Sequence, residues 1–252
     1  VNFLSVILNL IFIPCVSILL FPLTLLSVVL PISNILHKFI LVFENFSIFV
    51  SKFDVLVIVF PKINILFILI YYIVLLFVLN SILKHTYKNI FLMLFVILLW
   101  KYKVYMNPNM IVTYIDVRQG DSTLIQLPYN RGVILIDTGG VKNYIDNTIN
   151  ERVGENIVSY LNSLGINKID YLILSHGDYD HMGEAINFVN NFKVDKVIFN
   201  CGEFDELEQD LIKVLDKNKI PYYSCIKELN IDDNKLYFLN NKDYGNENDN
   251  SS

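Results

Sequence analysis

The fold is decided by the stretch LILSHGDYDHMG, residues Leu172–Gly183. Its first three residues are apolar, which is typical of a short strand buried on both faces of a parallel sheet. Two histidines and two aspartates follow within six positions, residues 176–181, and Gly177 and Gly183 punctuate this segment. The two glycines predict a tight loop, and the carboxyl ends of strands are where open α/β sheets bind their ligands.

The polar residues of this loop are His176, Asp178, Asp180 and His181. Imidazoles and carboxylates together are suitable ligands for a divalent metal ion such as zinc or manganese. The alternative is a polar turn in which His176 caps a helix and the aspartates are solvated. Because all four residues follow an apolar strand directly, we favour the metal site. His176 and Asp178 are then expected to bind one ion, and Asp180 and His181 a second.

Two metal ions held close together activate a water molecule and stabilise the leaving group of a hydrolysis reaction. This predicts a metal-dependent hydrolase. Asp180 is the candidate catalytic residue, because it either binds metal or orients the attacking water, and the sequence leaves both roles open.

The loop resembles the metal-binding motif of the metallo-β-lactamase superfamily, in the variant with Asp where many members have a second His. Residues 116–122 and 134–139 precede it, and the three segments together resemble the ComEC family of competence DNA-uptake proteins. Arg118 departs from that family, which usually has Gly there. The resemblance implies an αββα-layered α/β domain with two Zn or Mn ions in a complete member. It also implies phosphodiester hydrolysis, with single-stranded DNA as the substrate.

Two further aspartates, Asp137 and Asp121, lie in the preceding segments. The resemblance implies that Asp137 supports the metal loop through hydrogen bonds, and such partners orient metal ligands and tune the metal. Asp121 is either a similar support or the cap of its own turn, and the sequence favours neither role.

The two halves of the chain differ sharply in charge. The whole sequence is 54% hydrophobic, which is too apolar for an ordinary soluble protein. Up to Tyr105 it has seven lysines and two acidic residues, a net charge of +5, whereas from Met106 it has 13 basic and 23 acidic residues, a net charge of −10. We therefore predict a membrane region over residues 1–105 and a soluble domain over residues 106–252. An acidic domain binds nucleic acid poorly by charge alone, although bound metal ions would supply positive charge at the site.

The membrane region contains three predicted spans, at about residues 3–29, 63–83 and 89–105. Prolines in the first of them predict kinks. Residues 34–53 alternate apolar and polar side chains at helical spacing, which predicts an amphipathic helix in the membrane interface. The basic loop at residues 84–88 favours the cytoplasm, so we expect a multi-pass protein of the cell membrane whose soluble domain is extracytoplasmic.

In the soluble half, short apolar runs alternate with longer amphipathic runs, which predicts a layered α/β architecture. The Asn- and Ser-rich segment from Asn240 is expected to be mobile. Cys201 and Cys225 are either free structural thiols or partners in a disulfide. The predicted strands cover residues 111–117, 122–127, 133–137, 169–174, 197–200, 222–225 and 235–239, and the predicted helices cover residues 144–164, 184–192 and 204–215.

In the resembled family, a later Asp and a His-His-Gly element complete the set of metal ligands, and this sequence contains neither. The sequence also starts within an apolar run, and we therefore expect a chain truncated at both ends. One function is a DNA-uptake nuclease whose ligand set is completed by residues outside this sequence, with the lipid bilayer and other competence proteins as partners. The alternatives are an accessory piece of a DNA channel, an inactive fragment, and a membrane-tethered metallo-hydrolase unrelated to DNA uptake.

Overall fold

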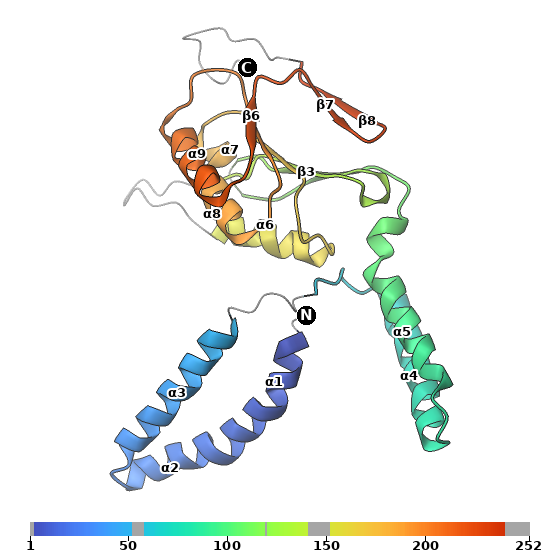
Figure 1. The fold of residues 1–252 in the computed structure, drawn as a ribbon, viewed down its shortest axis with the longest axis vertical. Coiled ribbons are helices and arrows are strands. Elements are labelled where there is room, and N and C mark those ends of the chain that lie inside the picture. Colours follow the sequence, from blue (N-terminus) through green and yellow to red (C-terminus); the bar gives the residue numbers. More distant parts are fainter. Residues whose placement is uncertain (1–2, 52–57, 119, 141–151, 240–252) are drawn as a thin grey trace. The chain divides into compact units, whose positions relative to one another are not determined.

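The computed structural model describes residues 3–51, 58–118, 120–140 and 152–239. The chain forms two units, residues 1–59 and residues 60–252, and each is described by itself (Figure 1). The first eight residues of the predicted helix at 144–164, the end of the predicted helix at 34–53 and the tail from Asn240 lie outside the described residues.

The first unit is a helical hairpin. Its first arm consists of α1 (Phe3–Pro14), a π-helical segment η1 (Cys15–Leu20) and α2 (Phe21–Val29). Pro14 and Pro22 lack the amide N–H that the α-helical ladder needs, and the widened turns of η1 lie between them. The Ser17 hydroxyl donates to the carbonyl of Ile13 at 2.6 Å, as expected where a helix loses regular hydrogen bonds.

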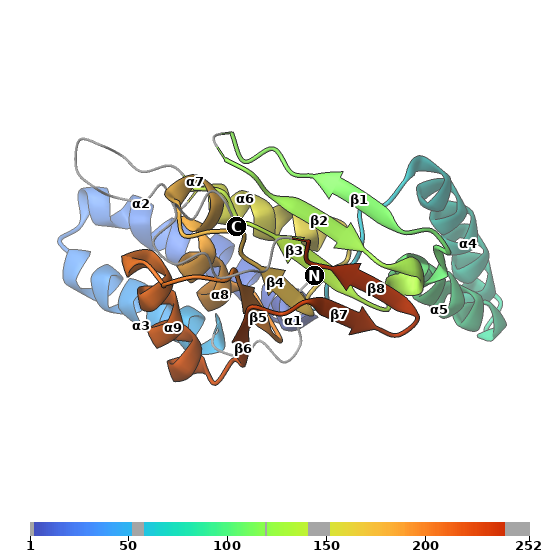
Figure 2. The ribbon, with the colours of Figure 1, turned by 90° about the horizontal axis from the view of Figure 1, so that it is seen from above.

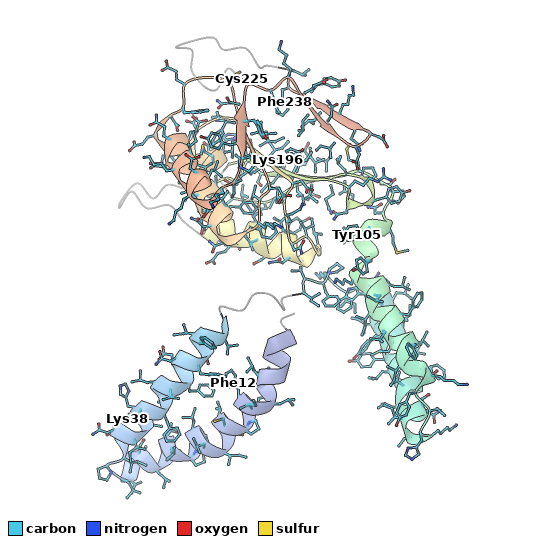
Figure 3. The ribbon with its side chains drawn as sticks, in the orientation of Figure 1. Phe12, Lys38, Tyr105, Lys196, Cys225 and Phe238 are labelled. Carbon is cyan, nitrogen blue, oxygen red and sulfur yellow. A yellow bond between two sulfur atoms is a disulfide. The ribbon has the colours of Figure 1, made fainter. Side chains whose placement is uncertain are left out.

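The second arm is α3 (Ser33–Ser51). Phe12 of the first arm, labelled in Figure 3, lies in the first unit. Its ring packs against those of Phe43 and Phe46 of α3, with centroids 4.7 and 5.8 Å apart. Most of the apolar face predicted from the sequence stays exposed, including Ile35, Val42 and Phe49. Much of the apolar surface of α3 is therefore exposed.

The second unit begins with a hairpin of two apolar helices, α4 (Ile65–Leu83) and α5 (Lys88–Lys101), followed by a 3₁₀ turn, η3 (Lys103–Met106) (Figures 1 and 2). By length and composition, residues 8–29 and 65–83 are the two helical stretches in the described residues that are able to cross a membrane. The predicted span at 89–105 consists of α5, which has 14 residues, followed by η3. At about 1.5 Å per residue α5 is shorter than a hydrocarbon core of about 30 Å.

A sheet of six strands, in the order β1-β2-β3-β4-β5-β6, forms the centre of the second unit. The first three strands are antiparallel, whereas β3, β4, β5 and β6 are parallel. The parallel part therefore gathers the carboxyl ends of four strands at one edge. The strands are β1 (Ile111–Tyr114), β2 (Thr123–Gln126), β3 (Val133–Ile136), β4 (Tyr171–Ile173), β5 (Val197–Phe199) and β6 (Tyr222–Ser224).

Both faces of the sheet are covered. Helices α6 (Arg152–Ser163), α8 (Ala185–Asn191) and α9 (Glu206–Asn218) pack on one face, and the hairpin of β7 (Glu228–Ile231) and β8 (Asn234–Tyr237) packs on the other (Figure 2). Leu172 and Leu174 face the helices, and Ile173 faces the hairpin. The predicted α/β class is confirmed, because a mixed sheet with helices is present, and the apolar run that feeds the loop is buried on both sides.

The start of β4 is held by an ion-paired lysine. The Lys168 Nζ lies 2.8 Å from Asp170 Oδ1 and 2.6 Å from Asp195 Oδ2. The hydrogen bond to Asp170, and then that to Asp195, raises the pKa of Lys168 well above its ordinary value. Asp170 also accepts from the backbone N–H of Val133 at 2.8 Å. The side chains that precede β4 therefore fix its register against both neighbouring strands.

Two elements were not predicted from the sequence. Strand β7 is short and half polar, and it is joined to β8 by the two-residue turn Asp232–Asp233. Asp232 has a φ of 49°, which aspartate tolerates better than most residues. The other element is α7 (Tyr179–Met182), a single helical turn inside the segment predicted as a loop. Leu229 and Ile231 alternate with polar residues before Asp232 and Asp233. This pattern is the sequence signal that could have predicted the hairpin.

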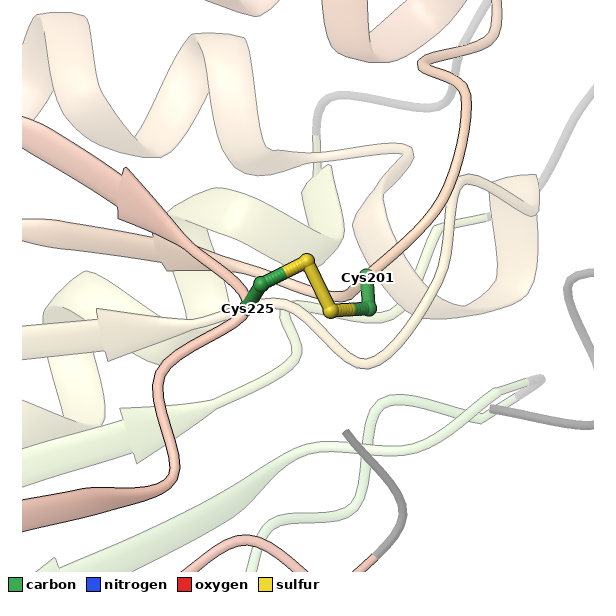
Figure 4. Close-up of a disulfide and its surroundings, with 2 residues drawn as sticks. All are labelled: Cys201 and Cys225. Carbon is green, nitrogen blue, oxygen red and sulfur yellow. A yellow bond between two sulfur atoms is a disulfide. The ribbon is translucent and has the colours of Figure 1, made fainter. Parts of the chain in front are cut away.

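A disulfide joins Cys201 and Cys225, and this decides between the two alternatives for these cysteines (Figure 4). Cys201 follows β5 and Cys225 follows β6, with their Cα atoms 4.6 Å apart. The bridge therefore ties the edge strand of the parallel sheet to its neighbour and closes a loop that contains α9.

We expect a variant with Ser at both Cys201 and Cys225 to lose about 3 kcal/mol of stability, because the unfolded chain is freed from a closed loop of about 25 residues. Pulse proteolysis of the full chain in detergent over a urea series measures this loss. The matched control is Cys15→Ser, which removes the free cysteine outside the bridge. Equal midpoints for the double variant and the wild type would contradict the prediction.

Candidate metal centre

The site lies where two parallel strands end side by side. Asp137 directly follows β3. Ser175 follows β4 after one intervening residue, Leu174. The Asp137 N–H donates to the carbonyl of Ile173 at 2.9 Å, which continues the ladder one step past the strands. The Asp137 carboxylate accepts from the Ser175 N–H at 2.8 Å and from the Ser175 hydroxyl at 2.7 Å. One buried carboxylate thus fixes the first residue of the loop.

The same carboxylate orients a histidine. Helix α7 brings His181 back over the strand ends, and its Nδ1 lies 3.0 Å from Asp137 Oδ2. Donation of the Nδ1 hydrogen to this carboxylate leaves Nε2 of His181 free to bind a metal. The His181 carbonyl accepts from the N–H groups of Thr138 and Gly139 at 2.7 and 3.0 Å. Both the ring and the backbone of His181 are therefore held by the segment after β3.

Three predicted ligands converge on one centre. One ligand atom from each of His176, Asp180 and His181 lies within 4.8 Å of the others. The two imidazole rings are close, with centroids 3.9 Å apart. The histidine side chains are 12% and 17% exposed, whereas the Asp180 side chain is 55% exposed. Two imidazoles and a carboxylate at one point fit a divalent ion such as zinc or manganese, with the carboxylate on the solvent side.

Asp178 is placed differently from the other three. It is the residue before α7, its side chain is 56% exposed, and its Oδ2 lies 3.5 Å from Nε2 of His176. It is not part of the three-residue group. Its assignment as a ligand therefore stays a prediction.

Gly120 and Asp121 reach the loop through the backbone. The N–H of Asp121 donates to the carbonyl of Asp180 at 3.1 Å. Gly120 has a φ of 100°, and a Cβ at this position would overlap the carbonyl oxygen of Asp180. The contact comes from the main chain of Asp121, and a role for its carboxylate stays a prediction. Gln119 of the same motif lies outside the described residues.

Sequence reasoning did not single out Ser175 as a functional residue. Its hydroxyl donates to Asp137 and lies 2.9 Å from Nδ1 of His176 and 3.3 Å from Nδ1 of His181. It therefore connects the buried carboxylate to both imidazoles. Its place directly before His176 was the only signal in the sequence.

Arg118 occupies a backbone conformation that favours glycine, with a φ of 68°. The left-handed conformation costs a non-glycine residue about 1–2 kcal/mol. Glycine avoids this cost, but the gain is partly offset because glycine loses more backbone entropy on folding. We therefore expect Arg118→Gly to stabilise the domain by about 0.5 kcal/mol, measured by pulse proteolysis of the full chain. Arg118→Ala is the control, because it removes the side chain but keeps the Cβ. A lower midpoint for the glycine variant than for the alanine variant would contradict this explanation.

The sheet domain belongs to the metallo-β-lactamase superfamily, whose profile matches residues 115–232. This range contains the segment before β2, Asp137 and the whole loop of the candidate metal centre. Membership of this superfamily and the cluster of His and Asp side chains together indicate a divalent-metal site.

The chain is also similar to ComE operon protein 3 of Bacillus subtilis (strain 168), with 36% identity over 107 residues. This alignment covers 40% of the present chain and 14% of that protein. The two matches support the assignment of this chain to the ComEC family and confirm the family predicted from the motifs. The relative and the two apolar helical stretches also indicate association with a membrane.

Proposed function

We propose that the soluble domain is a metal-dependent phosphodiester hydrolase within a membrane protein of DNA uptake, acting on single-stranded DNA. The observation that carries the proposal is the convergence of His176, Asp180 and His181 at the carboxyl end of β4. The similarity to a protein of the ComE operon supports the link to competence. Zinc or manganese, and two ions in the complete site, are part of this proposal.

His176, Asp180 and His181 would hold the metal, and Asp178 is the fourth proposed ligand. When bound, such an ion activates water for attack on a phosphodiester and balances the negative charge of the phosphate. Asp137 keeps His181 in the tautomer that presents Nε2, and Ser175 relays that constraint to His176. The exposed carboxylate of Asp180 is the proposed catalytic group, placed where it can orient a water molecule toward the substrate.

We further propose that the protein is multi-pass and that the soluble domain is extracytoplasmic. Two observations support this orientation. The disulfide between Cys201 and Cys225 is of a kind that persists in oxidising compartments outside the cytoplasm. The turn between α4 and α5 is flanked by Lys84, just after α4, and Lys88, the first residue of α5, and basic loops favour the cytoplasmic side.

The charge of the soluble half supports an accessory or unrelated role as the second candidate. With 23 acidic against 13 basic residues from Met106 onward, the domain repels the phosphates of DNA away from the metal site. On this alternative, the domain is an accessory piece of the channel or a hydrolase with another substrate.

The test is cleavage of an end-labelled single-stranded oligonucleotide by the full chain in detergent, after chelation and reloading with Mn²⁺ or Zn²⁺. We expect cleavage that depends on the added metal and is lost in His181→Ala. Asp216→Asn, an exposed change on α9, is the matched control. Stoichiometric metal binding without cleavage of single-stranded DNA would favour the second candidate.

A further inference from the structure

A pocket that is separate from the metal loop lies where the α4–α5 hairpin meets the sheet domain. Its volume is about 270 Å³, and all its lining residues belong to the second unit. Lys62 and Lys103 line it from the helical hairpin, and Gln126 and Asn130 from the sheet domain. The pocket therefore combines positive charge with amide groups and apolar side chains.

Two backbone hydrogen bonds hold the two walls of this pocket together, and one side-chain hydrogen bond braces the hairpin side. The N–H of Lys62 donates to the carbonyl of Ser163 at the end of α6 at 2.6 Å, and the N–H of Tyr129 donates to the carbonyl of Asn107 at 2.6 Å. The Trp100 indole N–H donates to the carbonyl of Pro61 at 2.9 Å. The pocket is thus a built part of the unit.

The two lysines meet at one end of the hairpin because Lys62 precedes α4 and Lys103 follows α5. Both are exposed, and in the described part of the chain neither forms an ion pair with a carboxylate. The side-chain oxygen of Asn130 is buried and has no hydrogen-bond partner among the described residues. Two cations without counterions and an acceptor without a donor suit a ligand that carries both a phosphate and hydroxyl groups.

The position of the pocket along the hairpin indicates where such a ligand comes from. Trp100, Tyr102 and Tyr105 lie at the same end of α5, where Figure 3 labels Tyr105. Aromatic residues of this kind mark the interface between a bilayer and water. Lysines beside a membrane helix extend to the headgroup level and attract anionic lipids. The net charge of the soluble half is −10, so these lysines are opposite in sign to the domain they adjoin.

We propose that this pocket binds the headgroup of an anionic phospholipid such as phosphatidylglycerol, and that the bound lipid fixes the hairpin to the sheet domain. The phosphate would lie between Lys62 and Lys103, and a headgroup hydroxyl would donate to Asn130. The inference rests on α4 crossing the membrane and is independent of whether the metal site cleaves DNA.

The single tryptophan of the chain serves as the reporter. Trp100 stacks on Phe60, with ring centroids 4.7 Å apart, and bonds to Pro61, which lines the pocket. We expect phosphatidylglycerol, titrated into the full chain in neutral detergent micelles, to change Trp100 emission saturably at concentrations where phosphatidylcholine has no effect. At about 1 kcal/mol for each lysine, the K62Q/K103Q double variant should bind phosphatidylglycerol about 30-fold more weakly.

The matched control is K84Q/K88Q, which removes two lysines from the opposite end of the same hairpin and should leave the titration unchanged. K62R/K103R keeps both charges and should retain binding. Equal responses to the two lipids, or an unchanged titration for K62Q/K103Q, would overturn the proposal. A lysine-dependent response to inorganic phosphate or to a single-stranded oligonucleotide that equals the response to phosphatidylglycerol would assign the pocket to that ligand instead. Metal-dependent cleavage is measured separately, so the two proposals fail independently.

Discussion

Asp137→Ala is expected to lower the stability of the sheet domain by about 4 kcal/mol and to weaken divalent-metal binding about 100-fold. The Asp137 side chain is only 6% exposed and accepts three hydrogen bonds, from Ser175 N–H, the Ser175 hydroxyl and His181 Nδ1. Alanine leaves these donors without an acceptor in a place that water reaches poorly. Residue 137 also has a φ of 57°, a conformation that Asp and Asn adopt more readily than alanine does.

Asp137→Asn separates the two effects. The amide oxygen still accepts from the Ser175 N–H, but the amide nitrogen faces His181 Nδ1, which then loses its acceptor. We expect a smaller loss of stability than for alanine, yet still a 10- to 100-fold weaker affinity for Mn²⁺ or Zn²⁺. Pulse proteolysis in urea and metal titration of the full chain provide the two readouts, with Asp216→Asn as the control. Wild-type metal affinity in Asp137→Asn would show that orientation of His181 by this carboxylate is unimportant.

Gly120→Ala is expected to cost about 4 kcal/mol and to disrupt the metal loop from outside. The added Cβ would overlap the backbone carbonyl oxygen of Asp180, which is unable to move away as a flexible side chain does. The φ of 100° is itself unfavourable for alanine. The displacement would break the hydrogen bond from the Asp121 N–H to Asp180 and move a predicted metal ligand.

The control for this substitution is Gly132→Ala, in the turn between β2 and β3. There the Cβ would meet only the side chains of Leu127 and Ile231. We expect that variant to lose about 1 kcal/mol or less and to keep its metal affinity. Metal titration and pulse proteolysis of both variants make the comparison, and equal effects of the two substitutions would show that the contact with Asp180 is not decisive.

The elements predicted best are those with strong local signals. The run of Leu172, Ile173 and Leu174 predicted a strand buried on both faces, because a core on each side requires uninterrupted apolar sequence. The same short loop predicted that its four polar residues lie near one another. The sequence paired His176 with Asp178 and Asp180 with His181, whereas the structure groups His176 with Asp180 and His181. These features depend on a few adjacent residues, and the sequence displays them directly.

The features that sequence reasoning missed depend on contacts distant in the chain. Ser175 reads as an ordinary loop residue until β3 brings Asp137 beside it, 38 positions away. Helix α7 is a single turn, which is too short to show a helical periodicity in the sequence. The pairing of Cys201 with Cys225 was left open because proximity depends on β5 and β6 being neighbours. For Ser175 and for the disulfide, the missing information was the order of strands in the sheet.

The hydrogen bonds of Asp137 connect the predicted ligands to the main core, because the residue continues β3 and holds the loop at the same time. Any cation that prefers the folded loop must then protect the whole sheet from unfolding, by about 4 kcal/mol at a thousand times its dissociation constant. The lifetime of this domain among proteases would thus follow the supply of free divalent ions in its surroundings. When such ions are scarce, the domain would both lack its metal and be degraded faster.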